Sequence, residues 1–280
     1  MTPESLAILY GLSAAAIWGT GDFAGGLATR RTEVTGVVLV SHILGLVLYL
    51  SLALISQEAI PDIRDLLYGA AAGLAGMFGL LALYKGLAEG RMGVTAPVAA
   101  VVTAILPMLV GFAMEGLPGS VQLFGFGMGL LAVWFLSSEG SGGKIRWQLL
   151  TLPVLAGIGF ALFLILIDRV TPGAFYWPLT AARVASVVFL LLILKARPQS
   201  KLPILAALPF VIISGLFDAG GNAFAMLAAQ TGRLDIASIL SAMYPVSTVL
   251  LAWLFLGERL SVSQRWGAGL ALMAVVLITL

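Results

Sequence analysis

The sequence predicts an all-α polytopic membrane protein in which ten transmembrane helices form two five-helix repeats of inverted topology. Two observations lead to this fold class. Of the 280 residues, 60% are hydrophobic and only 10% are charged, and the mean hydropathy is +1.07. Soluble domains carry about 25% charged residues, so lipid must be the solvent for most of this chain. The second observation is a repeat of the sequence at an offset of 142 residues.

The composition also excludes several kinds of site. The chain has no cysteine, which rules out disulfides and thiolate metal sites, and its single histidine, His42, cannot build a multi-histidine site. A net charge of +2 does not suggest nucleic-acid binding. The N-terminus "MTPES" lacks the basic segment of a signal peptide, so we expect the first apolar run to stay as a span. We expect no cofactor, no metal and no nucleic-acid partner.

Ten apolar segments are each long enough to cross a bilayer, which takes about 20 residues. Short polar loops such as "TRRTE" and "EGLPG" separate them, and short loops make successive helices antiparallel neighbours. We place the spans at 6–27, 34–56, 66–88, 93–114, 119–137, 148–167, 174–194, 203–229, 234–256 and 262–280.

The one break in composition, "SSEGSGGKIRW", lies at the middle of the chain and reads as a flexible linker. It divides the chain into a first repeat at 1–138, a linker at 139–147 and a second repeat at 148–280. At the 142-residue offset, Gly90-Arg91 falls on Gly232-Arg233, and Trp18 falls on Phe160. The same offset places Gln122, Gly125 and Gly127 on Gln264, Gly267 and Gly269.

An odd number of spans in each half gives the halves opposite orientations in the membrane. Inverted repeats are a common plan of secondary transporters, which place the substrate path at the interface between the repeats. A duplicated scaffold and a channel are the alternatives. We expect an integral membrane protein of a bacterial inner membrane. Three Lys or Arg residues lie on the side of the termini and eleven on the other side, so the positive-inside rule places both termini outside the cytoplasm.

Prolines interrupt the fourth span of each half. Pro245 cannot donate a hydrogen bond to the carbonyl of Ser241, and a carbonyl freed in this way must face protein or a watery cavity. Ser241, Tyr244 and Thr248 follow helical spacing and are expected to share a face. Pro107 lies in the matching span of the first half. We interpret Pro107 and Pro245 as helix breaks at a binding site; a packing kink is the alternative.

The second-half span closes on Glu258-Arg259, and the first half has Glu115 at the same helix end. A charge at the end of a span usually marks the interface. We therefore interpret this pair as the end of the span, with a functional site as the alternative.

Charges well inside spans are costly in lipid and tend to mark function. Arg183 lies near the middle of its span, and Asp218 lies midway along the next one, four residues before Asn222. An Arg183–Asp218 pair is geometrically possible. It would serve either as a structural bridge or as a functional pair that binds a zwitterion or carries a proton.

Two further polar residues are candidates in the first half. Asp22 follows Trp18 by four residues, so indole and carboxylate share a face suited to a cation or an amine. The alternative is an interfacial aromatic beside a capping acid. His42 is either a proton carrier or a polar contact between helices.

Small residues four apart, Gly125 with Gly129 and Gly267 with Ala271, let helices approach closely. They predict packing within the scaffold or at a homodimer contact.

The chain resembles the EamA-type members of the drug/metabolite transporter superfamily. The residues that carry this resemblance are "AAAIWGTGDF", "AAQTGRLDIASIL" and "YPVSTVLLAWLFLGERLS", and it covers essentially the whole chain. The first half departs from the pattern, because its proline stands only eight residues before Glu115. The resemblance implies a ten-helix fold and a central cavity. It also implies that both termini lie in the cytoplasm, which conflicts with the positive-inside rule applied above. It implies these cavity residues: Trp18, Phe78, Tyr84, Thr103, Phe160, Asn222, Ser241 and Tyr244.

We therefore expect a secondary transporter, not an enzyme, that exports or exchanges small metabolites by alternating access. Amino acids are the expected substrates, because the candidate lining combines aromatic rings and amides with few charges. A multidrug or organic-cation exporter that uses Asp22 or Asp218 is the alternative. An intramembrane enzyme would need a polar catalytic cluster that the sequence does not supply, and a scaffold or receptor would not need polar groups at mid-depth.

Overall fold

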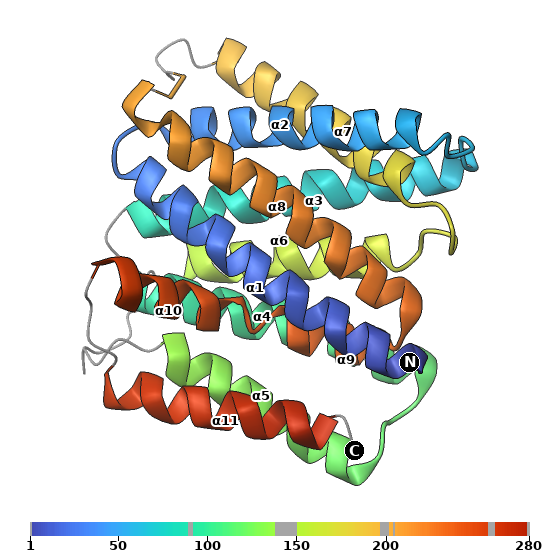
Figure 1. Cartoon of the computed structure of the whole chain (residues 1–280), viewed down its shortest axis with the longest axis vertical. Helices are drawn as coiled ribbons and strands as arrows, with labels where there is room; N and C mark the ends of the chain where they lie inside the picture. Colours follow the sequence, from blue (N-terminus) through green and yellow to red (C-terminus); the bar gives the residue numbers. More distant parts are fainter. Residues whose placement is uncertain are drawn as a thin grey trace.

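The chain folds into a bundle of helices, and the computed structural model describes residues 2–88, 92–137, 150–196, 202–203, 205–256 and 261–278 (Figure 1). In these residues the regular structure is helical throughout. The helices are α1 (Pro3–Thr29), α2 (Val34–Ile55), α3 (Ile63–Ala88), α4 (Met92–Glu115), α5 (Ser120–Ser137), α6 (Thr151–Ile167), α7 (Tyr176–Ala196), η2 (Leu205–Ala207), α8 (Leu208–Thr231), α9 (Leu234–Ser241), α10 (Tyr244–Leu256) and α11 (Val262–Ile278).

Most of these helices are long and apolar enough to cross a membrane. Among the described residues, seven segments meet both criteria, one of which joins α9 and α10 into a single span, Leu234–Phe255. Two shorter apolar helices lie at Ser120–Phe135 and Thr151–Ile167. Exposed leucine, isoleucine and phenylalanine side chains cover the outside of the bundle, as expected of a surface that faces lipid. The prediction of an all-α polytopic membrane protein is confirmed.

The two halves of the chain run in opposite directions through the bundle. In Figure 1 the N-terminus of α1 lies at the right-hand end, and the yellow loop that follows α6 lies at that same end. Thus α1 begins where α6, its partner in the second repeat, ends. We call this end of the bundle, at which Thr2 lies, the N-side. The C-terminal end of α11 also lies there.

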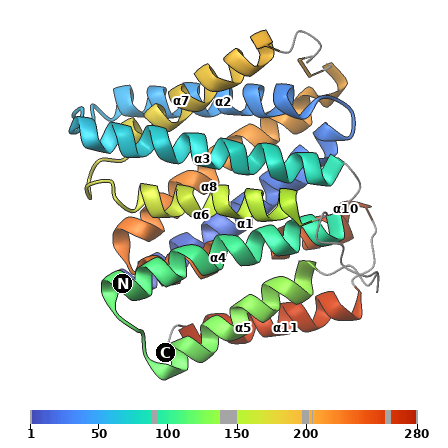
Figure 2. The same ribbon diagram turned by 180° about the vertical axis from the view of Figure 1, so that it is seen from behind.

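The contacts between helices follow an approximate two-fold symmetry. α1 packs along α8, and the equivalent pair α6 and α3 also packs together (Figure 2). α2 contacts its own equivalent, α7, and α5 contacts its own equivalent, α11. The interface between the repeats therefore runs through the middle of the bundle.

Glycines allow the helices at this interface to approach closely. A Cβ atom added at Gly159 of α6 would lie 2.7 Å from the Cα of Gly79 on α3, and one added at Gly157 would lie 2.6 Å from the carbonyl oxygen of Ala99 on α4. Lipid tails are as apolar as leucine, so close backbone packing of this kind is what holds membrane helices together.

The break predicted at Pro245 is confirmed. α9 ends at Ser241 and α10 begins at Tyr244, so Pro245 is the second residue of α10, where its missing N–H costs no helical bond. The amide of Met243 bonds to the carbonyl of Leu240 in a tightened last turn. Because the helix is interrupted here, helical spacing does not relate Ser241 to Tyr244. The expected shared face is therefore limited to Tyr244 and Thr248, which lie one turn apart in α10.

The break predicted at Pro107 is wrong. α4 continues through this residue as one helix from Met92 to Glu115. A proline removes one hydrogen bond from the ladder, but membrane helices tolerate this where neighbouring protein covers the freed group. Pro107 is buried, so protein covers this position.

The small-residue face of α5 is filled within the chain. An added Cβ at Gly125 would lie 3.0 Å from side-chain atoms of Leu277 and Ile278 on α11, and one at Gly129 would lie 3.1 Å from Ile239 on α9. The predicted scaffold packing is confirmed for these two glycines. The predicted homodimer stays a prediction. The linker 139–147 and the Glu258-Arg259 pair lie outside the described residues.

Candidate functional site

A cavity lies between the two repeats at the middle of the bundle. The volume open to the centre of a water molecule is about 40 Å³, enough for a few water molecules but not for an amino acid. The lining residues come from both repeats: Trp18, Asp22, His42, Gly73, Gly76, Met77, Leu80, Thr103, Phe160, Phe163, Leu179, Ala182, Arg183, Asp218, Asn222 and Tyr244.

The lining of the cavity follows the 142-residue repeat. Trp18 faces the cavity together with its equivalent, Phe160. Asp218 and Asn222 line it together with their equivalents, Gly76 and Leu80. The repeats thus supply matching positions but different chemistry, since both polar residues that α8 contributes have a small or apolar counterpart on α3.

Trp18 and Asn222 join α1 to α8 across the cavity wall. The indole Nε1 donates a 2.8 Å hydrogen bond to the Asn222 Oδ1. Gly221 makes this contact possible, because a Cβ atom there would lie 2.7 Å from the indole nitrogen. The Trp18 ring also packs edge-on against Phe163, with ring centroids 6.2 Å apart.

Arg183 of α7 and Asp218 of α8 form a buried ion pair. The Nη2 of Arg183 donates a 2.6 Å hydrogen bond to the Asp218 Oδ2, and the two side chains are 4% and 16% exposed. The guanidinium lies over the ring of Tyr49, 5.8 Å from its centre. Gly45 leaves room for it on α2, since an added Cβ would lie 2.9 Å from its Nε. The predicted pair is confirmed.

His42 extends this polar group to α2. Its Nδ1 lies 2.8 Å from the Ser186 hydroxyl, and its Nε2 lies 4.0 Å from the Asp218 Oδ2. Ser186 also donates to the carbonyl of Ala182. His42 on α2 therefore makes a polar contact with Ser186 on α7, as one of the two interpretations expected. A role of His42 as a proton carrier stays a prediction.

Asp22 differs from the other charged residues of the cavity. It lines the cavity from α1, and within the described segments of the chain no hydrogen bond or ion pair reaches its carboxylate. Its strongest charged neighbour is another carboxylate, Asp218. The predicted pairing of Asp22 with Trp18 puts both residues on the cavity wall, but the indole nitrogen bonds to Asn222.

Tyr244 and Thr103 bring the fourth spans of both halves to the cavity. The Tyr244 hydroxyl is buried and has no hydrogen-bond partner in the described part of the chain. The Thr103 hydroxyl donates a 2.7 Å bond to the carbonyl of Ala99 within its own helix. Of these two hydroxyl groups, therefore, only that of Tyr244 lacks a partner.

Three residues expected in the cavity lie outside its lining. Tyr84 is fully buried beside it and hydrogen bonds to Ser214 at 3.0 Å. Ser241 is buried at the end of α9, and its hydroxyl lacks a partner among the described residues. Phe78 is 48% exposed and packs against Phe189, so its assignment to the cavity is wrong. It follows the cavity residue Met77, and the next residue of a helix points about 100° away.

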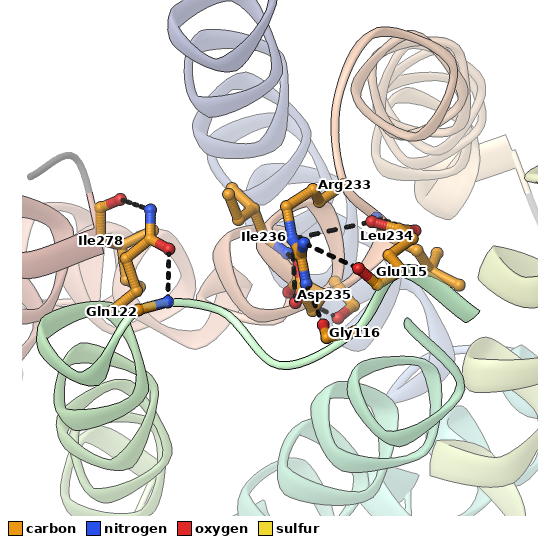
Figure 3. Close-up of polar contacts among 10 residues, drawn as sticks. Glu115, Gly116, Gln122, Arg233, Leu234, Asp235, Ile236 and Ile278 are labelled. Atoms are coloured by element: carbon orange, nitrogen blue, oxygen red, sulfur yellow. Dashed lines mark hydrogen bonds and ion pairs between the residues drawn. The ribbon is translucent and has the colours of Figure 1, made fainter. Parts of the chain in front are cut away.

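Polar contacts link the two repeats at the N-side. Arg233 stands at the start of α9 between both repeats (Figure 3). Its Nη2 donates to Asp235 at 2.8 Å and to the carbonyl of Gly116 at 2.6 Å, and its Nε lies 3.7 Å from the Glu115 carboxylate. The hydrogen bond to Asp235 raises the pKa of Arg233, so the guanidinium stays charged. Glu115 also accepts from the amide of Leu234.

Glu58, in the loop between α2 and α3, and Asp65, in the first turn of α3, make similar contacts that the sequence did not reveal. Glu58 accepts hydrogen bonds from the amides of Phe175 and Tyr176 at the start of α7, at 2.5 and 2.7 Å. Asp65 accepts from the amide and the hydroxyl of Thr171. A loop acid leaves no signal of a partner more than 100 residues away. The only signal is on the other side of the contact: the first amides of a helix, such as those at the start of α7, have no acceptor within the helix and need one from elsewhere.

Comparisons with known proteins place the chain in a family. The sequence profile of the EamA-like transporter family matches residues 5–138 and 145–280, that is, both repeats. The chain belongs to the EamA-like transporter family. No curated protein sequence matches this EamA-like chain. One solved crystal structure, whose title says only that it is the crystal structure of a protein, superposes with a TM-score of 0.81. It covers 98% of both chains at 16% identity, so it shows a shared fold.

Proposed function

We propose that this EamA-like protein is a secondary transporter that carries amino acids through the central cavity by alternating access between its repeats. Membership of a transporter family and a cavity on the repeat interface support the transport role. The observation that carries the substrate class is the cavity wall itself. It combines aromatic rings, one amide and one ion pair, which suits a small zwitterion better than a phosphorylated or lipid-like molecule.

The cavity volume of about 40 Å³ is too small for an amino acid, and polar contacts hold the N-side together. Loading a substrate therefore requires the repeats to move apart at one end of the bundle. In alternating access, this motion would break the contacts on one side while the other side closes. The proposed location is the inner membrane of a bacterium.

An uptake screen with purified protein in liposomes tests the proposal. Labelled amino acids of each charge class are supplied with and without a pH gradient, and uptake into protein-free liposomes is subtracted. Uptake of at least one class is expected. Asn222→Ala and Tyr244→Ala should lower this uptake, because both residues line the cavity, whereas Phe78→Ala is the control on the outer surface. No uptake of any amino acid would refute the proposal.

A second candidate function is export of organic cations without a carboxylate. The unpaired Asp22 carboxylate in an aromatic cavity favours it. The same liposomes loaded with tetraphenylphosphonium distinguish the two functions.

A further inference from the structure

The ionisable groups that line the central cavity do not balance in charge. Apart from the phenol of Tyr244, four of them belong to the described lining: Asp22, His42, Arg183 and Asp218. Arg183 and Asp218 neutralise each other at 2.6 Å. With a neutral imidazole at His42, which is already bonded to Ser186, the lining has one net negative charge when Asp22 is ionised, and that charge is located at Asp22.

Asp22 lies where that charge is costly. The preceding residue, Gly21, packs directly against α8, since an added Cβ would lie 3.3 Å from the amide nitrogen of Asp218. The Asp218 carboxylate repels Asp22, and the cation that could compensate, Arg183, is engaged by Asp218. A carboxylate without a partner at this depth in a membrane protein either takes up a proton or gives it up to pair with a cation, and a cationic ligand would favour the second state.

A second group in the same wall also lacks a partner. Tyr244 lines the cavity and is only 4% exposed. Its hydroxyl makes no hydrogen bond to any described residue. A phenolic hydroxyl can both donate and accept, so it is satisfied by either polar end of a substrate. A buried hydroxyl left unpaired in a native cavity points to a ligand that pairs with it.

We propose that the cavity selects amino acids with a net charge of +1, and that Asp22 binds an ammonium group of the substrate. The inference rests on the proposed function. A basic amino acid has two cationic groups and one carboxylate, which match in number the two carboxylates and the one guanidinium of the cavity. A neutral amino acid leaves Asp22 unmatched, and an acidic one adds a second like charge.

Counterflow in liposomes with the full-length wild-type protein tests this selection. Labelled lysine, leucine, glutamate and tetraphenylphosphonium serve as probes near neutral pH. Because one charge pair in a partly shielded site is worth at least about a factor of ten, lysine flux should exceed leucine flux by about tenfold or more. Glutamate flux should be lower still.

The possible results separate this inference from the proposed function. Leucine flux equal to or above lysine flux overturns the selection for charge but leaves amino-acid transport intact. Flux of tetraphenylphosphonium without any amino acid overturns both, as does the absence of flux for all four probes.

Substitutions assign the selection to Asp22. Asp22→Asn should reduce the ratio of lysine to leucine flux to about one, because the unmatched charge is gone, whereas Asp22→Glu should keep a ratio above one. Asp62→Asn is the matched control, since Asp62 is an exposed loop carboxylate. Size-exclusion profiles report folding. If Asp22→Asn does not fold, the wild-type and Asp22→Glu ratios decide. A folded Asp22→Asn protein that keeps the wild-type ratio refutes the role of Asp22.

Discussion

Arg183 on α7 and Asp218 on α8 form an ion pair at 2.6 Å in the wall of the central cavity. They lie 35 residues apart in the sequence, within the second repeat. The first repeat supplies the surroundings of this pair: Tyr49 lies against the guanidinium and His42 lies 4.0 Å from the carboxylate. A charge pair from one repeat thus needs the other repeat to shield it from lipid.

Breaking this pair on one side should destabilise the protein more than removing it. Asp218→Leu or Arg183→Met leaves one charge buried without a partner, which costs about 3–5 kcal/mol in soluble proteins. Arg183→Met combined with Asp218→Leu removes both charges, so its loss of stability should be smaller than the sum of the single losses by at least about 1 kcal/mol. Thermal unfolding in detergent measures all four proteins. Additive losses would contradict the pairing.

Gly221→Ala should disturb the Trp18–Asn222 contact and reduce transport. The added methyl group would lie 2.7 Å from the indole nitrogen, so the ring must move away from Asn222. Gly220→Ala is a control at the adjacent position, because its methyl group would be 3.4 Å from Ile17, an ordinary contact. Both variants have the same change in helix propensity. Initial rates of uptake compare them, and equal rates would show that the Trp18 position is unimportant.

Weakening the Arg233 contacts should favour opening of the N-side. Arg233→Gln removes the charge that joins the start of α9 to Glu115 and Gly116 at the end of α4 (Figure 3). A cysteine introduced at an N-side position of the cavity wall should then react faster with a water-soluble maleimide. Arg64→Gln is the control, because Arg64 is an exposed residue in the first turn of α3, on the same side. Unchanged labelling would mean that Arg233 does not hold the N-side closed.

The stability of the protein should depend on pH through Asp168. Burial raises the pKa of this carboxyl from the ordinary 3.8 to about 6; the positive charge of Arg169 opposes the shift and Glu115 adds to it. An ionised Asp168 is therefore less favourable in the folded protein than in the unfolded chain. Stability falls as the pH rises from 3.8 through about 6, and the full loss is present above that value.

Asp168→Asn should remove this loss. Its thermal midpoint should exceed that of the wild type at neutral pH and match it below about pH 3.8, where the carboxyl is protonated in both states. Asp62→Asn is the control in an exposed loop. An equal gain at both pH values would point to packing instead of ionisation.

The sequence by itself determined that this is a helical membrane protein built from two repeats. Hydropathy sets the spans because lipid accepts only segments whose backbone is satisfied internally, and this constraint is local. It also determined that Arg183, Asp218 and Asp22 are unusual, since a charge inside a span is costly wherever it points. A proline inside a span is a local signal of the same kind, because a missing N–H is a property of the residue itself, but of the two prolines singled out only Pro245 accompanies a break.

Only the tertiary structure decided which of these residues meet. The Arg183–Asp218 contact was one geometric possibility, whereas the pairing of Trp18 with Asn222 and the isolation of Asp22 depend on how α1 lies against α8. Phe78 and Pro107 were misassigned because the direction of a side chain and the support around a proline come from neighbouring helices. The contacts of Glu58 and Arg233 join loops more than 100 residues apart, and only the packing of the repeats brings such loops together.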